Sequence, residues 1–195
     1  MNIKLIASAA ALALMSGHAT AQETLRFGHV GNPGSLFEAS VENFAACVND
    51  ATDAVEVQTF GSSQLGRDQE LLQKLKLNQV NFALPSSVMS SVDDVFGIFE
   101  MPYIIKDRDH MRRVQGEMMG TFQDAANAQG YHIVGLAENG FRHITNNVRP
   151  INVPDDLAGI KLRTPKGAWR VKMFKRYGAN PTPMAFSEVF TALQT

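Results

Sequence analysis

TLRFGHV at residues 24–30 opens a series of three short apolar runs, and VEVQTF (55–60) and VNFAL (80–84) follow it. Each run has the length and composition of a β-strand and ends at a glycine or a proline. Between them, residues 35–48 and 66–77 repeat apolar side chains at helical spacing. The order strand, helix, strand, helix, strand is typical of a parallel sheet with helices on its faces. These residues therefore predict an α/β fold.

The first of these helices has both a start signal and an apolar face. Ser35 and Glu38 stand at the spacing of a capping box, in which the hydroxyl and the carboxylate accept hydrogen bonds from early backbone N–H groups. The apolar face consists of Phe37, Val41, Phe44, Ala45 and Val48. Cys47, the only cysteine, lies in the same helix, and we expect it to be a buried, unreactive thiol. A single cysteine excludes an internal disulfide and any zinc site built from several cysteines.

The remainder of the chain continues the alternation of helical and strand-like segments. Methionine and other apolar side chains recur at spacings of three and four over residues 107–128, which predicts a long helix with a core-facing stripe. Strands or extended segments are expected at 131–137, 141–147, 160–164 and 180–185, a helical turn at 154–157, and helices at 168–177 and 187–195. The last helix has an apolar face but no stop signal before Thr195, so we expect the chain to be a fragment of a longer protein.

Residues 1–21 have the form of a cleavable secretion signal. A basic start at Lys4 precedes an apolar run over residues 5–15, and Ala19-Thr20-Ala21 supplies the small residues that a signal peptidase needs. The alternative is a retained membrane anchor, but the run is much shorter than the roughly 20 residues that span a bilayer. We expect cleavage after Ala21 and a mature protein in the bacterial periplasm.

The composition excludes several functional classes. The 195 residues carry 18 Lys and Arg against 19 Asp and Glu, and no basic tract, which argues against a nucleic-acid partner. The motifs HExxH, GxSxG, Walker A and CxxC are absent from the sequence. Gly28, Gly31 and Gly34 are spaced GxxGxxG, which favours a turn or a ligand-lining loop over a dinucleotide site. The histidines show no metal-ligand spacing, so we expect no enzyme activity, no metal and no cofactor.

Two arginines are candidates for ligand binding. Arg163 stands near the end of the expected strand 160–164, and Arg142 follows the expected strand 131–137. Open α/β sheets bind their ligands at the ends of strands, and a guanidinium group can hold a carboxylate through two hydrogen bonds. The alternative is an internal salt bridge to an acidic residue, and the spacing alone does not choose between them.

Four stretches carry a resemblance to a known family: GSSQLG (61–66), NGFR (139–142), KLRTP (161–165) and NPTPMAFSEVFTALQT (180–195). With these motifs the chain resembles the periplasmic solute receptors of TRAP (tripartite ATP-independent periplasmic) transporters, the family of the C4-dicarboxylate-binding type. The resemblance implies the two-lobed, type II-like periplasmic binding protein fold, here incomplete. Lobe I would cover about 22–139, and a crossover into lobe II would occupy about 140–195, with the C-terminal remainder absent.

The resemblance also implies a ligand-binding site in the cleft between the lobes. The positions that match the family's site are Arg163, Arg142, Phe186, Asn139, Asp68 and Ser86. In such receptors the arginine at Arg163 anchors the ligand carboxylate through a bidentate salt bridge, and the arginine at Arg142 is a second polar contact. Phe186 matches an aromatic that packs against the ligand. Asp68 and Ser86 match cleft-facing positions of the first lobe, and the asparagine helps to orient the loop or the ligand.

The function implied by the resemblance is transport without covalent chemistry. A receptor of this kind binds an organic acid and delivers it to TRAP permease membrane subunits, which are driven by an ion gradient. A sensory protein with the same pocket and a signalling partner is the first alternative, and a periplasmic enzyme acting on carboxylates is the second. The identity of the acid stays open among C4-dicarboxylates, sugar acids, sialic acid, 2-oxo acids and aromatic acids.

Overall fold

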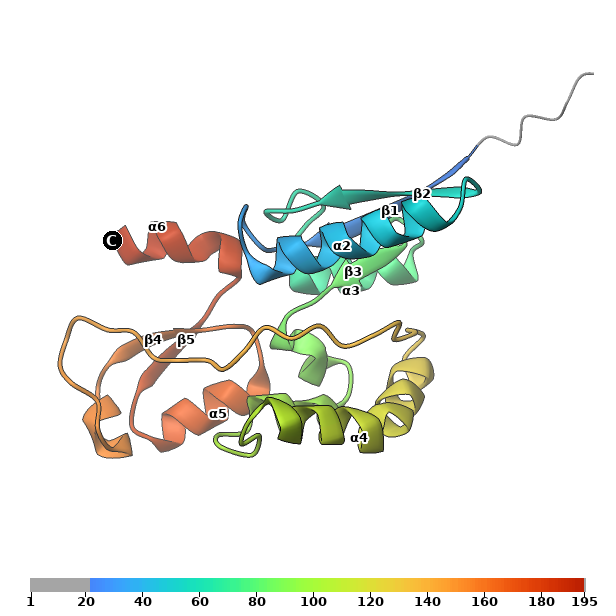
Figure 1. Ribbon diagram of the computed structural model, residues 1–195. Coiled ribbons are helices and arrows are strands. Elements are labelled where there is room, and N and C mark those ends of the chain that lie inside the picture. The colour runs from blue at the N-terminus through green and yellow to red at the C-terminus, as the bar shows by residue number, and fades with distance from the viewer. Residues whose placement is uncertain (1–21, 195) are drawn as a thin grey trace, which may run out of the picture.

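The computed structural model describes residues 22–194, so the predicted signal peptide and Thr195 lie outside the described residues. The first part of the chain forms a three-stranded sheet from β1 (Glu23–His29), β2 (Val55–Phe60) and β3 (Phe82–Leu84) (Figure 1). The strand order is β2-β1-β3, and both strand pairs are parallel. The predicted parallel sheet is thereby confirmed.

Helices α2 (Leu36–Ala51) and α3 (Asp68–Lys76) cover opposite faces of this sheet. On the α2 face, the buried core consists of Phe27, Val41, Ala45 and Val57. On the α3 face, it consists of Val30, Leu71 and Val80. Helix α3 approaches β1 so closely that a Cβ atom at Gly28 would lie 2.6 Å from Leu71 Cδ2. A larger residue at this position would therefore force the buried Leu71 side chain to shift.

The start of α2 follows the prediction in part. The Ser35 hydroxyl accepts a hydrogen bond from the Glu38 N–H at 3.2 Å, as in a capping box. The Glu38 carboxylate accepts from the N–H of Gly34 at 2.6 Å instead of from that of Ser35. The prediction of a buried Cys47 is wrong, because this side chain is exposed. Val41 and Ala45 face the sheet, and the helical period then directs position 47 away from it.

A second, two-stranded sheet forms from β4 (Lys161–Thr164) and β5 (Asn180–Pro183), which are parallel. Helix α5 (Ala168–Arg176) connects the two strands and packs on β5. After β5, a short 3-10 helix η5 (Phe186–Glu188) leads into α6 (Val189–Gln194), which Figure 1 shows on the opposite side of this sheet from α5. The predicted elements of this part of the chain are confirmed.

In chain order, the segment between β3 and β4 contains η2 (Ser87–Ser91), η3 (Asp94–Glu100) and the long helix α4 (Arg108–Ala128). The prediction of a long helix with a core-facing stripe is confirmed. Its fully buried members, Phe122 and Ala126, pack with Phe96 of η3 as a third core cluster. The Asp107 carboxylate caps the helix by accepting from the N–H of His110 at 2.7 Å.

The expected strands at 131–137 and 141–147 are absent: these residues have no strand structure in the described chain. The alternating pattern has another cause, since Tyr131, Ile133 and Leu136 are partly buried against the α4 cluster. Alternation reports which side chains are buried, whereas a strand also needs a neighbouring backbone, and no described residue pairs with this segment. The helical turn expected at 154–157 forms as the 3-10 helix η4 (Pro154–Leu157).

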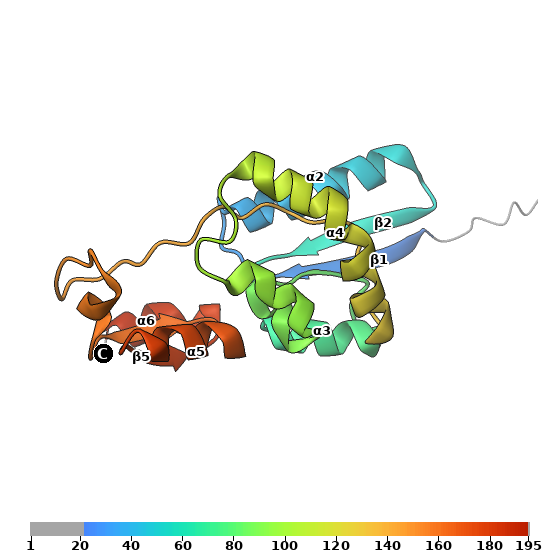
Figure 2. The ribbon, with the colours of Figure 1, turned by 90° about the horizontal axis from the view of Figure 1, so that it is seen from below.

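The two sheets stand side by side. Figure 2 shows β1, β2, α2, α3 and α4 on one side and α5, α6 and β5 on the other, with an extended segment crossing between them. The lobe boundary near residue 139 stays a prediction. Within the described part of the chain, no helix combines the length and the apolar character needed to cross a membrane.

Candidate functional site

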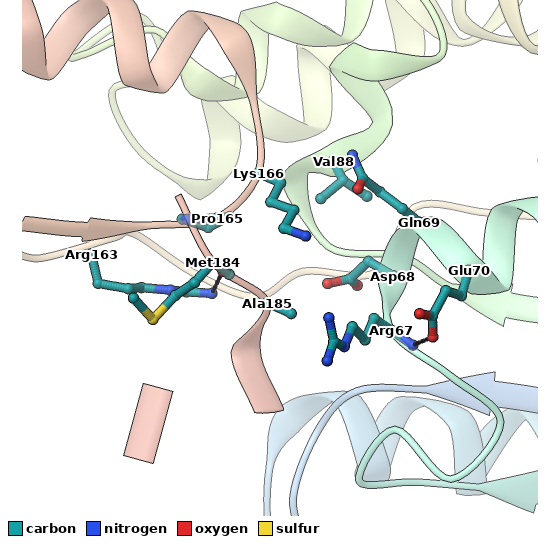
Figure 3. A pocket seen from close by; sticks show the side chains of 10 residues that line it. All are labelled: Arg67, Asp68, Gln69, Glu70, Val88, Arg163, Pro165, Lys166, Met184 and Ala185. Carbon is teal, nitrogen blue, oxygen red and sulfur yellow. Dashed lines mark hydrogen bonds between the residues drawn. The ribbon is translucent and has the colours of Figure 1, made fainter. Parts of the chain in front are cut away.

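A pocket of about 60 Å³ opens where the two sheets face each other (Figure 3). Its walls come from the start of α3, from η2, from the residues after β4 and from the residues after β5. Each of these segments follows the carboxyl end of a parallel strand. The pocket therefore lies where open α/β sheets bind ligands.

Arg163 enters the pocket from β4, and its guanidinium group is only partly used by the protein. Its Nη2 donates a hydrogen bond to the carbonyl of Met184 at 2.9 Å, and its carbon Cζ lies 6.0 Å from the ring centre of Phe186. Its buried Nε has no partner among the described residues. Burial lowers the pKa of Arg163, repulsion by Arg142 lowers it further, and attraction to Asp68 opposes both effects. Apart from the contact with Met184, the guanidinium group makes no hydrogen bond within residues 22–194, so it keeps donors for a ligand.

Asp68, at the start of α3, and Arg163 are directed toward one another from opposite sides of the pocket (Figure 3). The Asp68 side chain is buried, and its Oδ1 accepts a hydrogen bond from the N–H of Ser86 at 3.0 Å. Burial raises the pKa of Asp68, and the Ser86 hydrogen bonds and the charges of Arg163 and Arg142 oppose that rise. Asp68, Ser86, Arg163 and Phe186 thus lie close together, and their contact with a ligand stays a prediction.

Replacing Asp68 by asparagine is expected to stabilise the unliganded chain at neutral pH. Because the pKa of Asp68 is raised in the folded state, folded Asp68 holds its proton more tightly than unfolded Asp68 does. Its contribution to the free energy of unfolding is therefore complete below the ordinary pKa of 3.8 and is lost as pH rises through the pKa of the folded state. Asparagine keeps the oxygen that accepts from Ser86 and carries no charge. Thermal unfolding should give Asp68→Asn a higher melting temperature than the parent at pH 7, with the difference shrinking toward pH 3. A lower melting temperature at pH 7 would contradict this.

Arg142 reaches the same region from the extended segment after α4. Its Nη2 donates to the hydroxyl of Ser87 at 3.1 Å. The residue is exposed as a whole, but desolvation of the guanidinium group lowers the pKa of Arg142, and attraction to Glu100 and Asp68 opposes this. Asn139 is exposed, and its side chain makes no hydrogen bond to any of the residues described. Its contact with a ligand stays a prediction.

The structure adds Arg170, Glu100, Ser87 and Ser90, which the sequence analysis missed. Arg170 of α5 is 5% exposed, and its Nη1 donates to the Ser87 hydroxyl at 2.7 Å. The buried Glu100 carboxylate accepts from the backbone N–H of Arg170 at 3.0 Å and from the hydroxyl of Ser90. The burial of both charged residues was visible in the sequence pattern. Arg170 lies on the same helix face as Phe174, and Glu100 interrupts an apolar run.

Arg142, Arg163 and Arg170 form no ion pair with a carboxylate. Of the three ion pairs found among residues 22–194, one lies at the pocket and joins Arg67, which lines it, to Glu188 of η5 at 3.1 Å; the other two lie elsewhere. These three guanidinium groups share the site with the carboxylates of Asp68 and Glu100. The pocket wall also carries Glu70, Lys166 and Arg67, the last paired with Glu188, so positive charges outnumber negative ones by one. Over residues 22–194, no group of histidine, cysteine and acidic side chains is arranged to hold a metal ion.

Comparison with known proteins places this geometry among solute receptors. The chain is 35% identical to the C4-dicarboxylate-binding periplasmic protein DctP of Rhodobacter capsulatus, over 97% of this chain and 58% of that protein. A TRAP periplasmic solute-binding protein from Sulfurospirillum deleyianum with bound succinate has a TM-score of 0.81 and 35% identity, over 89% of this chain and 57% of that one. The sugar acid binding protein DctPAm of Advenella mimigardefordensis, in complex with galactonate, has a TM-score of 0.81 and 33% identity, over 88% and 56%.

The chain spans just over half the length of these relatives. The family model for bacterial extracellular solute-binding proteins, family 7 (DctP), matches residues 27–195, which is nearly all of the chain that the structure describes. Apart from the first residues of β1, the parallel sheets, the pocket at their strand ends and the KLRTP arginine lie within the matched residues. The chain therefore belongs to family 7 of the bacterial extracellular solute-binding proteins.

Proposed function

We propose that the protein is an extracytoplasmic receptor that binds an organic acid through its carboxylate and delivers it to a TRAP permease. The observation that carries the proposal is the state of Arg163: a guanidinium group directed into a pocket, with a buried Nε that lacks a partner and no carboxylate at ion-pairing distance. A partly buried cation that has no ion-pairing partner is unfavourable, and a carboxylate ligand would supply the missing negative charge. The relatives crystallised with succinate and galactonate also bind carboxylates.

The other site residues have distinct roles in this proposal. Arg163 forms the bidentate pair with the ligand carboxylate, and Phe186 packs against the body of the ligand beside it. Asp68 and Ser86 lie across the pocket from Arg163, where they accept hydrogen bonds from the ligand's polar groups or donate hydrogen bonds to them. Asn139, whose side chain makes no hydrogen bond to the described residues, is proposed to help orient the ligand. Closure of the two lobes, about 22–139 and 140–195, would remove water from the ion pair and strengthen it.

The proposal includes export and excludes covalent chemistry. Residues 1–21 are proposed to direct the chain to the periplasm and to be removed after Ala21. The bound acid is then released unchanged to the permease subunits, and no group in the pocket is assigned a nucleophile or a general base. The acid recovered from a binding mixture should therefore have an unchanged mass, whereas a product of new mass would contradict a carrier function.

The experiment that tests the proposal compares acids with their amides. The full chain is expressed with its own N-terminal segment and purified from the periplasm, where its first residue is expected to be Gln22. Isothermal titration calorimetry is then run with succinate, malate, galactonate and glucuronate, and with the neutral amide of each acid. At least one acid should bind about 30-fold or more tightly than its amide, since the amide loses the charged pair with Arg163. Equal affinity for acids and amides, or no binding of any acid, would contradict the proposal.

A further inference from the structure

Asp68 is a buried carboxylate in the wall of the pocket. It is 7% exposed, and its hydrogen bonds come from Ser86, whose backbone nitrogen lies 3.0 Å from Oδ1. Within residues 22–194, no nitrogen of a lysine, arginine or histidine lies within 4.0 Å of its oxygens. Carboxylates this deeply buried are rarely left without a paired cation. The charged form of Asp68 therefore depends on cations that stand farther away.

Charged groups face Asp68 from its own helix and from the segments across the pocket. They are Arg67 and Glu70 beside it in the chain, Arg163 and Lys166 from β4 and the turn after it, and Arg142 from the segment after α4. Arg67 and Glu70 are already engaged, the first in an ion pair and the second as acceptor from a backbone N–H. The 3-10 helix η2 contributes no charged side chain. Arg163 points toward Asp68 across the pocket (Figure 3), and it is the strongest of the charges that stabilise ionised Asp68.

Ligand binding would change this balance in one direction. A ligand carboxylate that pairs with Arg163 offsets the cation that faces Asp68, and it places a second negative charge in the same pocket of about 60 Å³. The ligand also displaces water, which makes an ionised carboxylate less favourable. Two carboxylates confined to one site hold a proton far more readily than one alone. All three changes raise the pKa of Asp68, which burial already holds above its ordinary value.

We infer that Asp68 takes up a proton from the solvent when the organic acid binds, and that its neutral carboxyl group then donates a hydrogen bond to an oxygen of the ligand. This inference rests on the proposed function and adds to it a role for the wall opposite Arg163. The proton is added at Oδ2, while Oδ1 continues to accept from the N–H of Ser86. Asp68 is thus a specificity-determining residue, because it favours a ligand with a hydrogen-bond acceptor on the side that faces it.

The inference fixes the sign of the pH dependence of binding. Because the liganded chain would hold more protons than the unliganded chain, the affinity should rise as pH falls, by at most about tenfold per pH unit. The rise begins as pH falls through the pKa of Asp68 in the liganded chain and ends below its pKa in the unliganded chain. In Asp68→Asn, which carries no titrating group at this position, this part of the pH dependence should disappear.

The experiment measures the protons that are taken up on binding. The full chain is titrated between pH 5.5 and 8 with whichever of succinate, malate, galactonate and glucuronate binds most tightly, in PIPES and in Bis-Tris, two buffers with different ionisation enthalpies. The difference in heat between the buffers gives the number of protons. The parent should take up about 0.3 proton or more at some pH in this range, and Asp68→Asn less than about 0.1. Glu70→Gln removes the other carboxylate of the pocket wall and should retain the uptake.

The outcomes separate this inference from the proposed function. If the parent binds an acid without taking up a proton, if Asp68→Asn takes up as many protons as the parent, or if Glu70→Gln abolishes the uptake, the inference is wrong and the proposed function stands. If the parent binds none of the acids, the proposed function fails, and this inference fails with it.

A second measurement on the parent does not depend on how well Asp68→Asn folds or binds. Infrared difference spectroscopy should show the carbonyl band of a protonated carboxyl group when the acid binds, and labelling the aspartates with carbon-13 should shift that band. A difference spectrum without this band, or with a band that the label does not shift, would overturn the inference.

Discussion

Replacing Arg163 by alanine is expected to lower the affinity for the preferred organic acid by about 30- to 4,000-fold, which corresponds to about 2–5 kcal/mol. The variant removes the group that would pair with the ligand carboxylate, while Asp68 remains on the opposite wall of the pocket. The ligand carboxylate would then lose its bidentate partner and lie beside another carboxylate. Calorimetric titration of the acid into the parent and the variant measures this loss directly.

Two further variants make this result specific. Arg113→Ala removes an exposed arginine from α4 and should leave the affinity unchanged, which controls for the loss of one positive charge from the chain. Arg163→Lys keeps a positive charge but loses the planar fork, so it should recover only part of the binding. An unchanged affinity in Arg163→Ala would remove this residue from the site.

Replacing Phe122 by alanine is expected to lower the free energy of unfolding by about 3–5 kcal/mol. Phe122 is 0% exposed, and its ring centre lies 5.6 Å from that of Phe96 and 5.3 Å from that of Phe99. The truncation would leave a cavity between α4 and η3, lined by side chains that have no other way to fill it. Since a domain of this kind is stable by only about 5–15 kcal/mol, the variant should lose a large part of its stability.

Urea unfolding followed by circular dichroism measures this change, with Phe190→Ala as the control. Phe190 is the same residue type in a helix but is 74% exposed, so its truncation should change the free energy of unfolding by less than about 0.5 kcal/mol. A similar small change for Phe122→Ala would mean that the third core cluster contributes little to the stability of the chain.

Local patterns predicted the elements whose causes are local. The strands at 24–30 and 55–60 form close to their predicted bounds, because apolar β-forming residues are bounded there by glycine. The capping residue Ser35 predicted the start of α2, and the helical period of apolar residues predicted the buried face of α4. Arg163 and Phe186 were expected in one site, and the structure brings them within 6.0 Å of each other.

The errors arose where a pattern has two structural causes. Residues 131–137 alternate like a strand, but their apolar side chains pack on α4 and the backbone has no neighbouring strand in the described chain. Cys47 was expected to be buried because cysteine usually is, although the face defined by Val41 and Ala45 already directed it outward. The pattern at 131–137 could be interpreted correctly only once its packing partner was known, whereas the exposure of Cys47 already followed from the helical period.

The amino-acid sequence by itself determined the alternating strands and helices, the parallel first sheet and the family, and it identified Arg163 as the candidate anchor, because each depends on a local pattern or on a short motif. The cluster of Arg142, Arg170, Ser87 and Glu100 depends on the tertiary structure, since it joins four segments that are distant in sequence. Whether a charged residue is solvated at the surface or buried beside another charge is a property of the space around it, and only the packed chain defines that space.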